Sequence, residues 1–169
     1  MNREQLLLRR IQWLTWLFII GLFLSGVTAI PLQFEVNRLI SILGFEEWGS
    51  QPSAPLLVEW LFKVRDALND TGAHHSFLFY GTDWLAFGHF VIAIVFIGAL
   101  RDPLRNRWLF DFGLLACVLV IPYALVFGGL RGIPFWWRLI DCSFGVFGFI
   151  PLWFCRKWAK ELEQRKKAD

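Results

Sequence analysis

Residues 108–129 read WLFDFGLLACVLVIPYALVFGG, and Asp111 is the only charged residue among them. A helix needs about 20 predominantly apolar residues to cross about 30 Å of hydrocarbon, so this stretch is long enough to span a membrane. Three further stretches have the same character, at residues 11–30, 77–100 and 135–155. The chain is therefore predicted to be an all-α integral membrane protein with four transmembrane helices.

The overall composition supports this fold class. Hydrophobic residues make up 56% of the chain, with 18 Phe and 10 Trp, whereas only 18% of the residues are charged. A chain of this composition is difficult to keep soluble, and residues 1–169 are predicted to form a single membrane domain. The net charge of +3 does not indicate a nucleic-acid partner, because the basic residues lie beside the apolar stretches. The predicted partner is the lipid bilayer.

The distribution of Lys and Arg predicts the orientation of the four spans. Twelve basic residues lie before the first span, between the second and third spans, and in the tail 156–169, whereas five lie in the other two loops or at the start of the fourth span. Cytoplasmic segments of membrane proteins carry the excess of Lys and Arg. Both termini are therefore predicted to be cytoplasmic, in a bacterial-type inner membrane. The twelve are Arg3, Arg9, Arg10, Arg101, Arg105, Arg107, Arg156, Lys157, Lys160, Arg165, Lys166 and Lys167.

The first span has an alternative interpretation as a secretory signal peptide. Arg9 and Arg10 precede an apolar run, and the small residues of 25–29 follow it. The run is long for the hydrophobic region of a signal peptide, and Trp13 and Trp16 lie early in it. We therefore predict an uncleaved first helix, whereas cleavage would leave three spans.

The long first outer loop, residues 31–76, is predicted to contain two amphipathic helices. Apolar residues recur at helical spacing after Pro31, and Gly44 is a stop signal. A second amphipathic pattern follows Ser53, a candidate N-cap, and ends before Gly72. The two helices are expected to form an outer helical cap on the membrane surface or over the bundle. A surface for docking a partner is the alternative.

Ionisable residues within or beside the spans are the candidate functional residues. They are costly in hydrocarbon, so they are usually paired or functional. We name five of them the polar cluster, expected at the outer ends of spans two and four: Asp83, His89, Arg131, Arg138 and Asp141. One alternative is a structural salt bridge of Arg138 with Asp83 or Asp141, beside a hydrogen-bonded His89. The other is a binding site for a ligand, substrate or proton.

No pattern in the sequence predicts a metal ion or another cofactor. His74, His75 and His89 are the only histidines, and with Asp83 they have no recognisable metal-ligand spacing. Haem held by two histidines would need a second span with a histidine, and only one span has one. Nucleotide-binding loops, zinc-protease motifs and nucleophile elbows do not occur either.

These observations favour a multi-pass inner-membrane protein of structural or accessory type, without enzymatic activity and with a protein partner or a second copy of itself. The alternative is binding or transport of a lipid-like or small polar ligand through the polar cluster. An enzymatic role, with His89 or Asp83 as an acid or base, is a third hypothesis, but no substrate-defining motif accompanies it.

Overall fold

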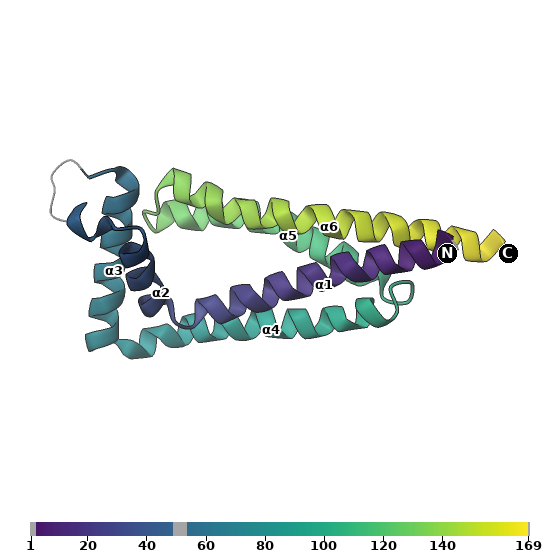
Figure 1. The fold of residues 1–169 in the computed structure, drawn as a ribbon, viewed down its shortest axis with the longest axis horizontal. Helices are drawn as coiled ribbons and strands as arrows, with labels where there is room; N and C mark the ends of the chain where they lie inside the picture. The colour runs from purple at the N-terminus through teal and green to yellow at the C-terminus, as the bar shows by residue number, and fades with distance from the viewer. Residues whose placement is uncertain (1–2, 49–53, 169) are drawn as a thin grey trace. The chain divides into compact units, whose positions relative to one another are not determined.

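The computed structural model describes residues 3–48 and 54–168, and the regular structure in this part of the chain is entirely helical (Figure 1). This confirms the all-helical class, and four of the described helices are long and apolar enough to cross a membrane. They are α1 (Arg3–Ala29), α4 (Tyr80–Arg101), α5 (Arg107–Leu130) and α6 (Phe135–Ala168). The chain forms two compact units, Met1–Gly21 with Ile92–Asp169, and Leu22–Val91.

The segment between the first two apolar helices contains α2 (Leu32–Ile42), the 3-10 helix η1 (Phe45–Trp48), α3 (Leu56–His74) and the 3-10 helix η2 (Ser76–Phe79). The predicted stop at Gly44 is confirmed, because Gly44 has a φ of +65° after the last turn of α2, a conformation that glycine adopts most easily. The predicted cap, Ser53, lies outside the described residues.

The predicted stop at Gly72 is wrong, because α3 continues through this residue to His74. Gly72 instead faces the Gln33 side chain of α2. A Cβ atom at this position would lie 2.6 Å from Oε1 of Gln33. The glycine therefore leaves room for the end of this side chain.

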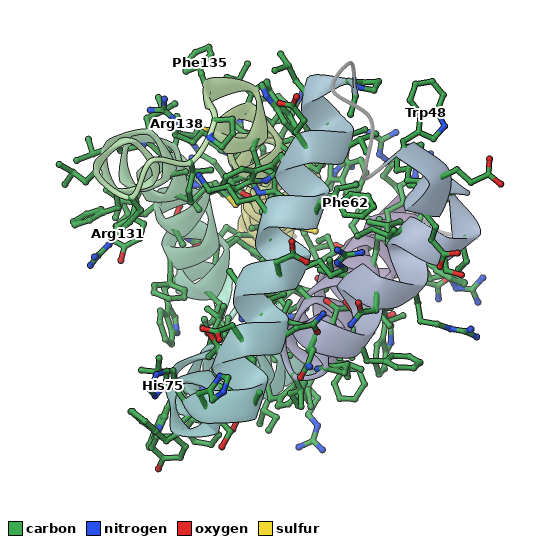
Figure 2. The ribbon with its side chains drawn as sticks, turned by 90° about the vertical axis from the view of Figure 1, so that its left-hand side faces the viewer. Trp48, Phe62, His75, Arg131, Phe135 and Arg138 are labelled. Carbon is green, nitrogen blue, oxygen red and sulfur yellow. The ribbon has the colours of Figure 1, made fainter. Side chains whose placement is uncertain are left out.

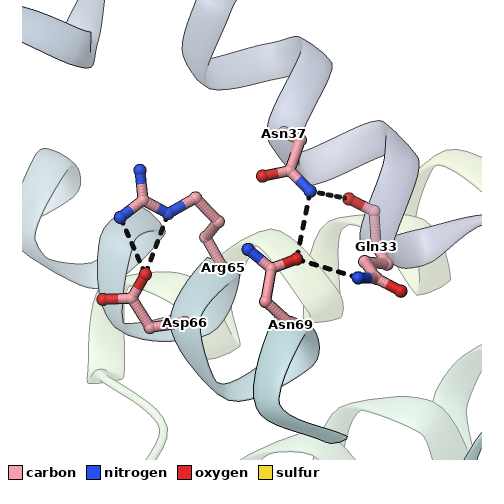
Figure 3. A network of polar contacts seen from close by, with 5 residues as sticks. All are labelled: Gln33, Asn37, Arg65, Asp66 and Asn69. Atoms are coloured by element: carbon pink, nitrogen blue, oxygen red, sulfur yellow. Dashed lines mark hydrogen bonds and ion pairs between the residues drawn. The ribbon is translucent and has the colours of Figure 1, made fainter. Parts of the chain in front are cut away.

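Polar side chains join α2 to α3 (Figure 3). Nε2 of Gln33 donates a hydrogen bond of 3.0 Å to Oδ1 of Asn69, and Nδ2 of Asn37 donates one of 3.2 Å to the same oxygen. Nδ2 of Asn37 also donates to the backbone carbonyl of Gln33, at 2.7 Å. These bonds hold the two helices in one register, because each amide needs a partner at a fixed position.

The helices α5 and α6 form a closely packed hairpin in the other unit (Figure 1). A Cβ atom at Gly145 of α6 would lie 2.5 Å from the backbone oxygen of Cys117, and one at Gly113 of α5 would lie 2.7 Å from Cδ1 of Leu152. Small residues at both positions let the two backbones approach. Lipid tails are as apolar as leucine, so close packing of this kind is a main source of helix association in membranes.

The first part of α1 packs on α6 through a buried polar contact. The hydroxyl of Thr15 donates a hydrogen bond of 2.8 Å to the carbonyl of Ile11 within α1. The thiol of Cys155 lies 3.6 Å from the same carbonyl and 3.8 Å from the Thr15 hydroxyl. Thr15 and Cys155 are fully buried, and in the same unit the ring of Phe18 packs against that of Phe96 at a centroid distance of 4.8 Å.

Ion pairs join the helices at the charged ends of α5 and α6. Arg156 pairs with Asp111, and Arg107 pairs with Glu163 at 2.5 Å. A hydrogen bond from Lys167, together with the positive charges of Lys167 and Arg107, holds the pKa of Glu163 below its usual value. These groups are largely exposed, so each pair contributes little to stability.

Replacing Gly145 with alanine tests the α5–α6 contact. We expect Gly145→Ala to lower the free energy of unfolding by about 1–3 kcal/mol, because the new methyl group would meet the Cys117 backbone. Gly21→Ala is the matched control, since nothing lies within 4 Å of a Cβ atom there. Thermal unfolding of both variants in the same detergent measures the difference. Equal melting temperatures would contradict the packing described.

Candidate functional site

The five residues of the polar cluster belong to two different units. Asp83 and His89 lie on α4 within Leu22–Val91, whereas Arg131, Arg138 and Asp141 lie at the α5–α6 connection and on α6. The predicted grouping of all five residues at one place stays a prediction. The neighbours of each residue within its own unit can nevertheless be described.

Asp83 lies on an aromatic face of α4. Tyr80, Asp83, Trp84 and Phe87 are spaced so that they share one side of the helix, and they line a shallow hollow of about 260 Å³. The ring of Trp84 packs edge-to-face against Tyr80 at 5.9 Å and against Phe87 at 5.5 Å. Asp83 is exposed, and it forms no ion pair with a described residue of its own unit. The hollow therefore presents a carboxylate between aromatic rings.

His89 is bound to the backbone of its own helix. Its Nδ1 lies 2.8 Å from the carbonyl oxygen of Leu85, one turn earlier. A carbonyl can only accept a hydrogen bond, so Nδ1 carries the proton, and in the neutral ring Nε2 is left as an acceptor. The bond fixes the orientation of the ring and agrees with the hydrogen-bonded His89 of the structural alternative.

The end of α5 shows why Arg138 is positioned as it is. The helix ends in a Schellman motif, in which Gly132 has a φ of +71°. The amide of Ile133 donates to the carbonyl of Gly128 at 2.9 Å, and the amide of Gly132 donates to that of Gly129 at 3.1 Å. The chain reverses in this turn, and α6 then carries Arg138 back alongside the last turns of α5.

Arg138 lies across the end of α5, beside Phe135 (Figure 2). Its Nη1 donates a hydrogen bond of 3.0 Å to the carbonyl of Leu125, and its guanidinium lies 5.3 Å from the centre of the Phe135 ring. A Cβ atom at Gly128 would lie 2.7 Å from Cγ and Cδ of Arg138, so glycine makes room for the stem. The positive charge lies at the negative end of the α5 dipole, which is a stabilising arrangement.

Arg131 and Asp141, the other two residues of the polar cluster in this unit, make fewer contacts than Arg138. Arg131 is exposed at the C-cap of α5. Asp141 is half-buried, and although it lies one turn after Arg138, the arginine is directed to α5. Within this unit's described residues, no ion pair joins Arg138 to Asp141. Nε of Arg138 is buried and has no hydrogen-bond partner. The Arg138–Asp141 form of the predicted salt bridge is therefore not formed here.

The described residues contain no group of three or more His, Cys, Asp or Glu side chains placed to hold one metal ion. His74 has an exposed partner on its own helix, because its Nδ1 lies 2.9 Å from Oδ1 of Asp70 on α3. The three cysteines, Cys117, Cys142 and Cys155, are buried and form no disulfide.

Sequence reasoning missed Phe87 and the pair Gly128–Gly129. Phe87 is one of many phenylalanines, and only its position one turn after Asp83 distinguishes it. Two adjacent glycines just before a helix end are a detectable signal, because a long side chain of the next helix can cross there.

No family model matches the sequence, no curated protein is similar to it, and no solved structure matches it.

Removing the Arg138 side chain tests its structural role. We expect Arg138→Ala to lower the free energy of unfolding by about 1.5–3 kcal/mol, the usual range for a hydrogen bond made by a charged group. Arg131→Ala removes the same charge from the same connection, at an exposed position, and should change stability by less than about 0.5 kcal/mol. Thermal unfolding in detergent compares the two. Equal stability of both variants would contradict a structural role for Arg138.

Proposed function

We propose that the chain is a multi-pass protein of a bacterial-type inner membrane, with four spans, cytoplasmic termini and a structural or accessory, non-enzymatic role. The orientation is supported by the twelve Lys and Arg residues on the side of the termini, against five on the other side. The accessory role includes association with another membrane protein or with a second copy of the chain.

In this proposal α2 and α3 form the outer cap. The two helices are joined to each other by the amides of Gln33, Asn37 and Asn69. They carry exposed apolar side chains, such as Ile42 at 77% and Leu56 at 72% exposure, together with charged residues. Helices of this kind suit the interface between the headgroups and the hydrocarbon, where both kinds of side chain find a favourable environment.

One observation carries the structural role: three of the ionisable groups of the apolar helices bond within the protein. Nη1 of Arg138 donates to the Leu125 carbonyl, Nδ1 of His89 binds its own helix, and Asp111 pairs with Arg156. The bond of Arg138 completes a helix end, the pair Asp111–Arg156 joins two helices, and the bond of His89 fixes its ring against its own helix. Catalysis needs a base or nucleophile directed toward a substrate, and these bonds direct the groups toward the protein itself.

Asp83 and Asp141 favour a second function, the binding or transport of a lipid-like or small polar ligand through the polar cluster. Neither carboxylate forms an ion pair with a described residue of its own unit. The aromatic hollow around Asp83 offers ring faces and a negative charge together, which suits a small cationic group. An ionisable group in a span without a partner is a reasonable candidate for such a role.

The orientation can be tested by labelling single cysteines. In a variant with Cys117, Cys142 and Cys155 replaced by alanine, we expect a membrane-impermeant maleimide to label Ser76→Cys in intact spheroplasts. Gln164→Cys should be labelled only after permeabilisation. Both positions are exposed, so burial does not limit the reaction. The cysteine-free variant is the control for background. The opposite pattern of labelling would overturn the proposed orientation.

Native mass spectrometry of the gently extracted protein distinguishes the two functions. The accessory role predicts a reproducible added mass equal to one protein partner or to a second copy. It also predicts no small molecule whose binding depends on Asp83. Asp83→Asn is compared with Glu59→Gln, which removes one carboxylate from an exposed position on α3. A small ligand lost in Asp83→Asn at unchanged melting temperature, and retained in Glu59→Gln, would favour the binding function instead.

A further inference from the structure

A groove outside the polar cluster lies between the N-terminal half of α1 and the end of α4. It has a volume of about 690 Å³ and is lined by Arg9, Gln12, Trp13, Trp16, Leu100 and Arg101. All six residues belong to the same compact unit. The groove therefore combines two guanidinium groups, one amide and two indole rings, and it contains no acidic side chain.

Arg9 and Arg101 differ from most basic residues around them. Among the described residues, neither forms an ion pair, a side-chain hydrogen bond or a ring contact, and both are exposed. Asp102, next to Arg101, accepts a hydrogen bond from the backbone amide of Arg105. Other basic residues of this unit do form ion pairs or ring contacts. They include Arg3, Arg10, Arg107, Arg156, Lys157, Arg165 and Lys167. The groove thus holds two positive charges that the protein does not balance there.

We propose that this groove binds the headgroup of an anionic phospholipid, with its phosphate held by Arg9 and Arg101. Guanidinium groups bind phosphate oxygens through paired, charge-assisted hydrogen bonds. Gln12 adds an amide that can donate to the headgroup. An anionic lipid fits better than a zwitterionic one, because the groove has two cations and no carboxylate to pair with a choline group.

The aromatic and apolar residues favour a lipid over a free anion. Trp13 is 77% exposed and Trp16 is 46% exposed, and indole rings favour the level of the headgroups. Along α1 the exposed side chains of Leu17 and Ile20 continue from the groove toward the middle of the helix. An acyl chain can lie along this surface, whereas inorganic phosphate gains nothing from it. The inference rests on the apolar helices lying in a membrane and is independent of the accessory role.

Lipid titration by native mass spectrometry tests the site on the purified full chain in detergent. The probes are phosphatidylglycerol and phosphatidylcholine with identical acyl chains. We expect the first phosphatidylglycerol to bind more tightly than phosphatidylcholine. Arg9→Gln/Arg101→Gln should reduce this preference by about thirty-fold, which corresponds to about 2 kcal/mol at about 1.4 kcal/mol per factor of ten. The matched control, Arg105→Gln/Lys166→Gln, removes the same charge outside the groove and should retain the preference.

Equal losses in the two double variants would overturn the site, because diffuse attraction would then explain the preference. An unchanged preference in Arg9→Gln/Arg101→Gln would also overturn it. Inorganic phosphate that binds alone and displaces the lipid at equal concentration would identify a soluble anion instead. Gln12→Glu keeps both arginines and changes only an exposed side chain, so it tests the site if the double variant does not fold. It should weaken phosphatidylglycerol binding at an unchanged melting temperature, and unchanged binding would contradict the proposal.

Discussion

Backbone amides and carbonyls inside hydrocarbon have no water to bond with, so a chain that crosses a membrane must satisfy them within itself. Four of the described helices are long and apolar enough for this constraint to apply, and the ends of two of them satisfy their last carbonyls within the protein. The C-terminus of α5 meets it with a Schellman turn at Gly132 and with the guanidinium of Arg138 on the Leu125 carbonyl. At the C-terminus of α4, Nδ2 of Asn106 donates hydrogen bonds to the carbonyls of Gly98 and Asp102, at 2.9 and 3.0 Å.

Helix association depends on small residues, because burial of apolar side chains gives little advantage over lipid. Gly145 and Gly113 bring α6 and α5 together, and Gly26 lets α1 approach Phe90 of α4 in the other unit. Between α2 and α3 the contact is polar, and Gly72 leaves room there for the end of the Gln33 side chain. The glycines of this chain thus include several that shape helix contacts, besides those that end helices at Gly44 and Gly132.

Charge has three roles along the chain. Some charged groups join helices, as Arg107 does with Glu163 and Arg156 with Asp111. Arg138 completes a helix end. A third group, which includes Asp83, Asp141, Arg9 and Arg101, has no ion-pair partner among the described residues of its own unit. Both the alternative function and the lipid site arise from this third group, since an unbalanced charge near hydrocarbon is stabilised by a partner from outside.

The sequence by itself determined the helical class, the four apolar helices and the end of α2 at Gly44, because hydropathy, length and glycine conformation are local properties. Only the tertiary structure decided that Gly72 lies inside α3, that Arg138 is directed to Leu125 and not to Asp141, and that Arg9 and Arg101 share a groove. These three depend on the distance between helices and on the direction of long side chains, and a pattern of residues along one helix contains neither.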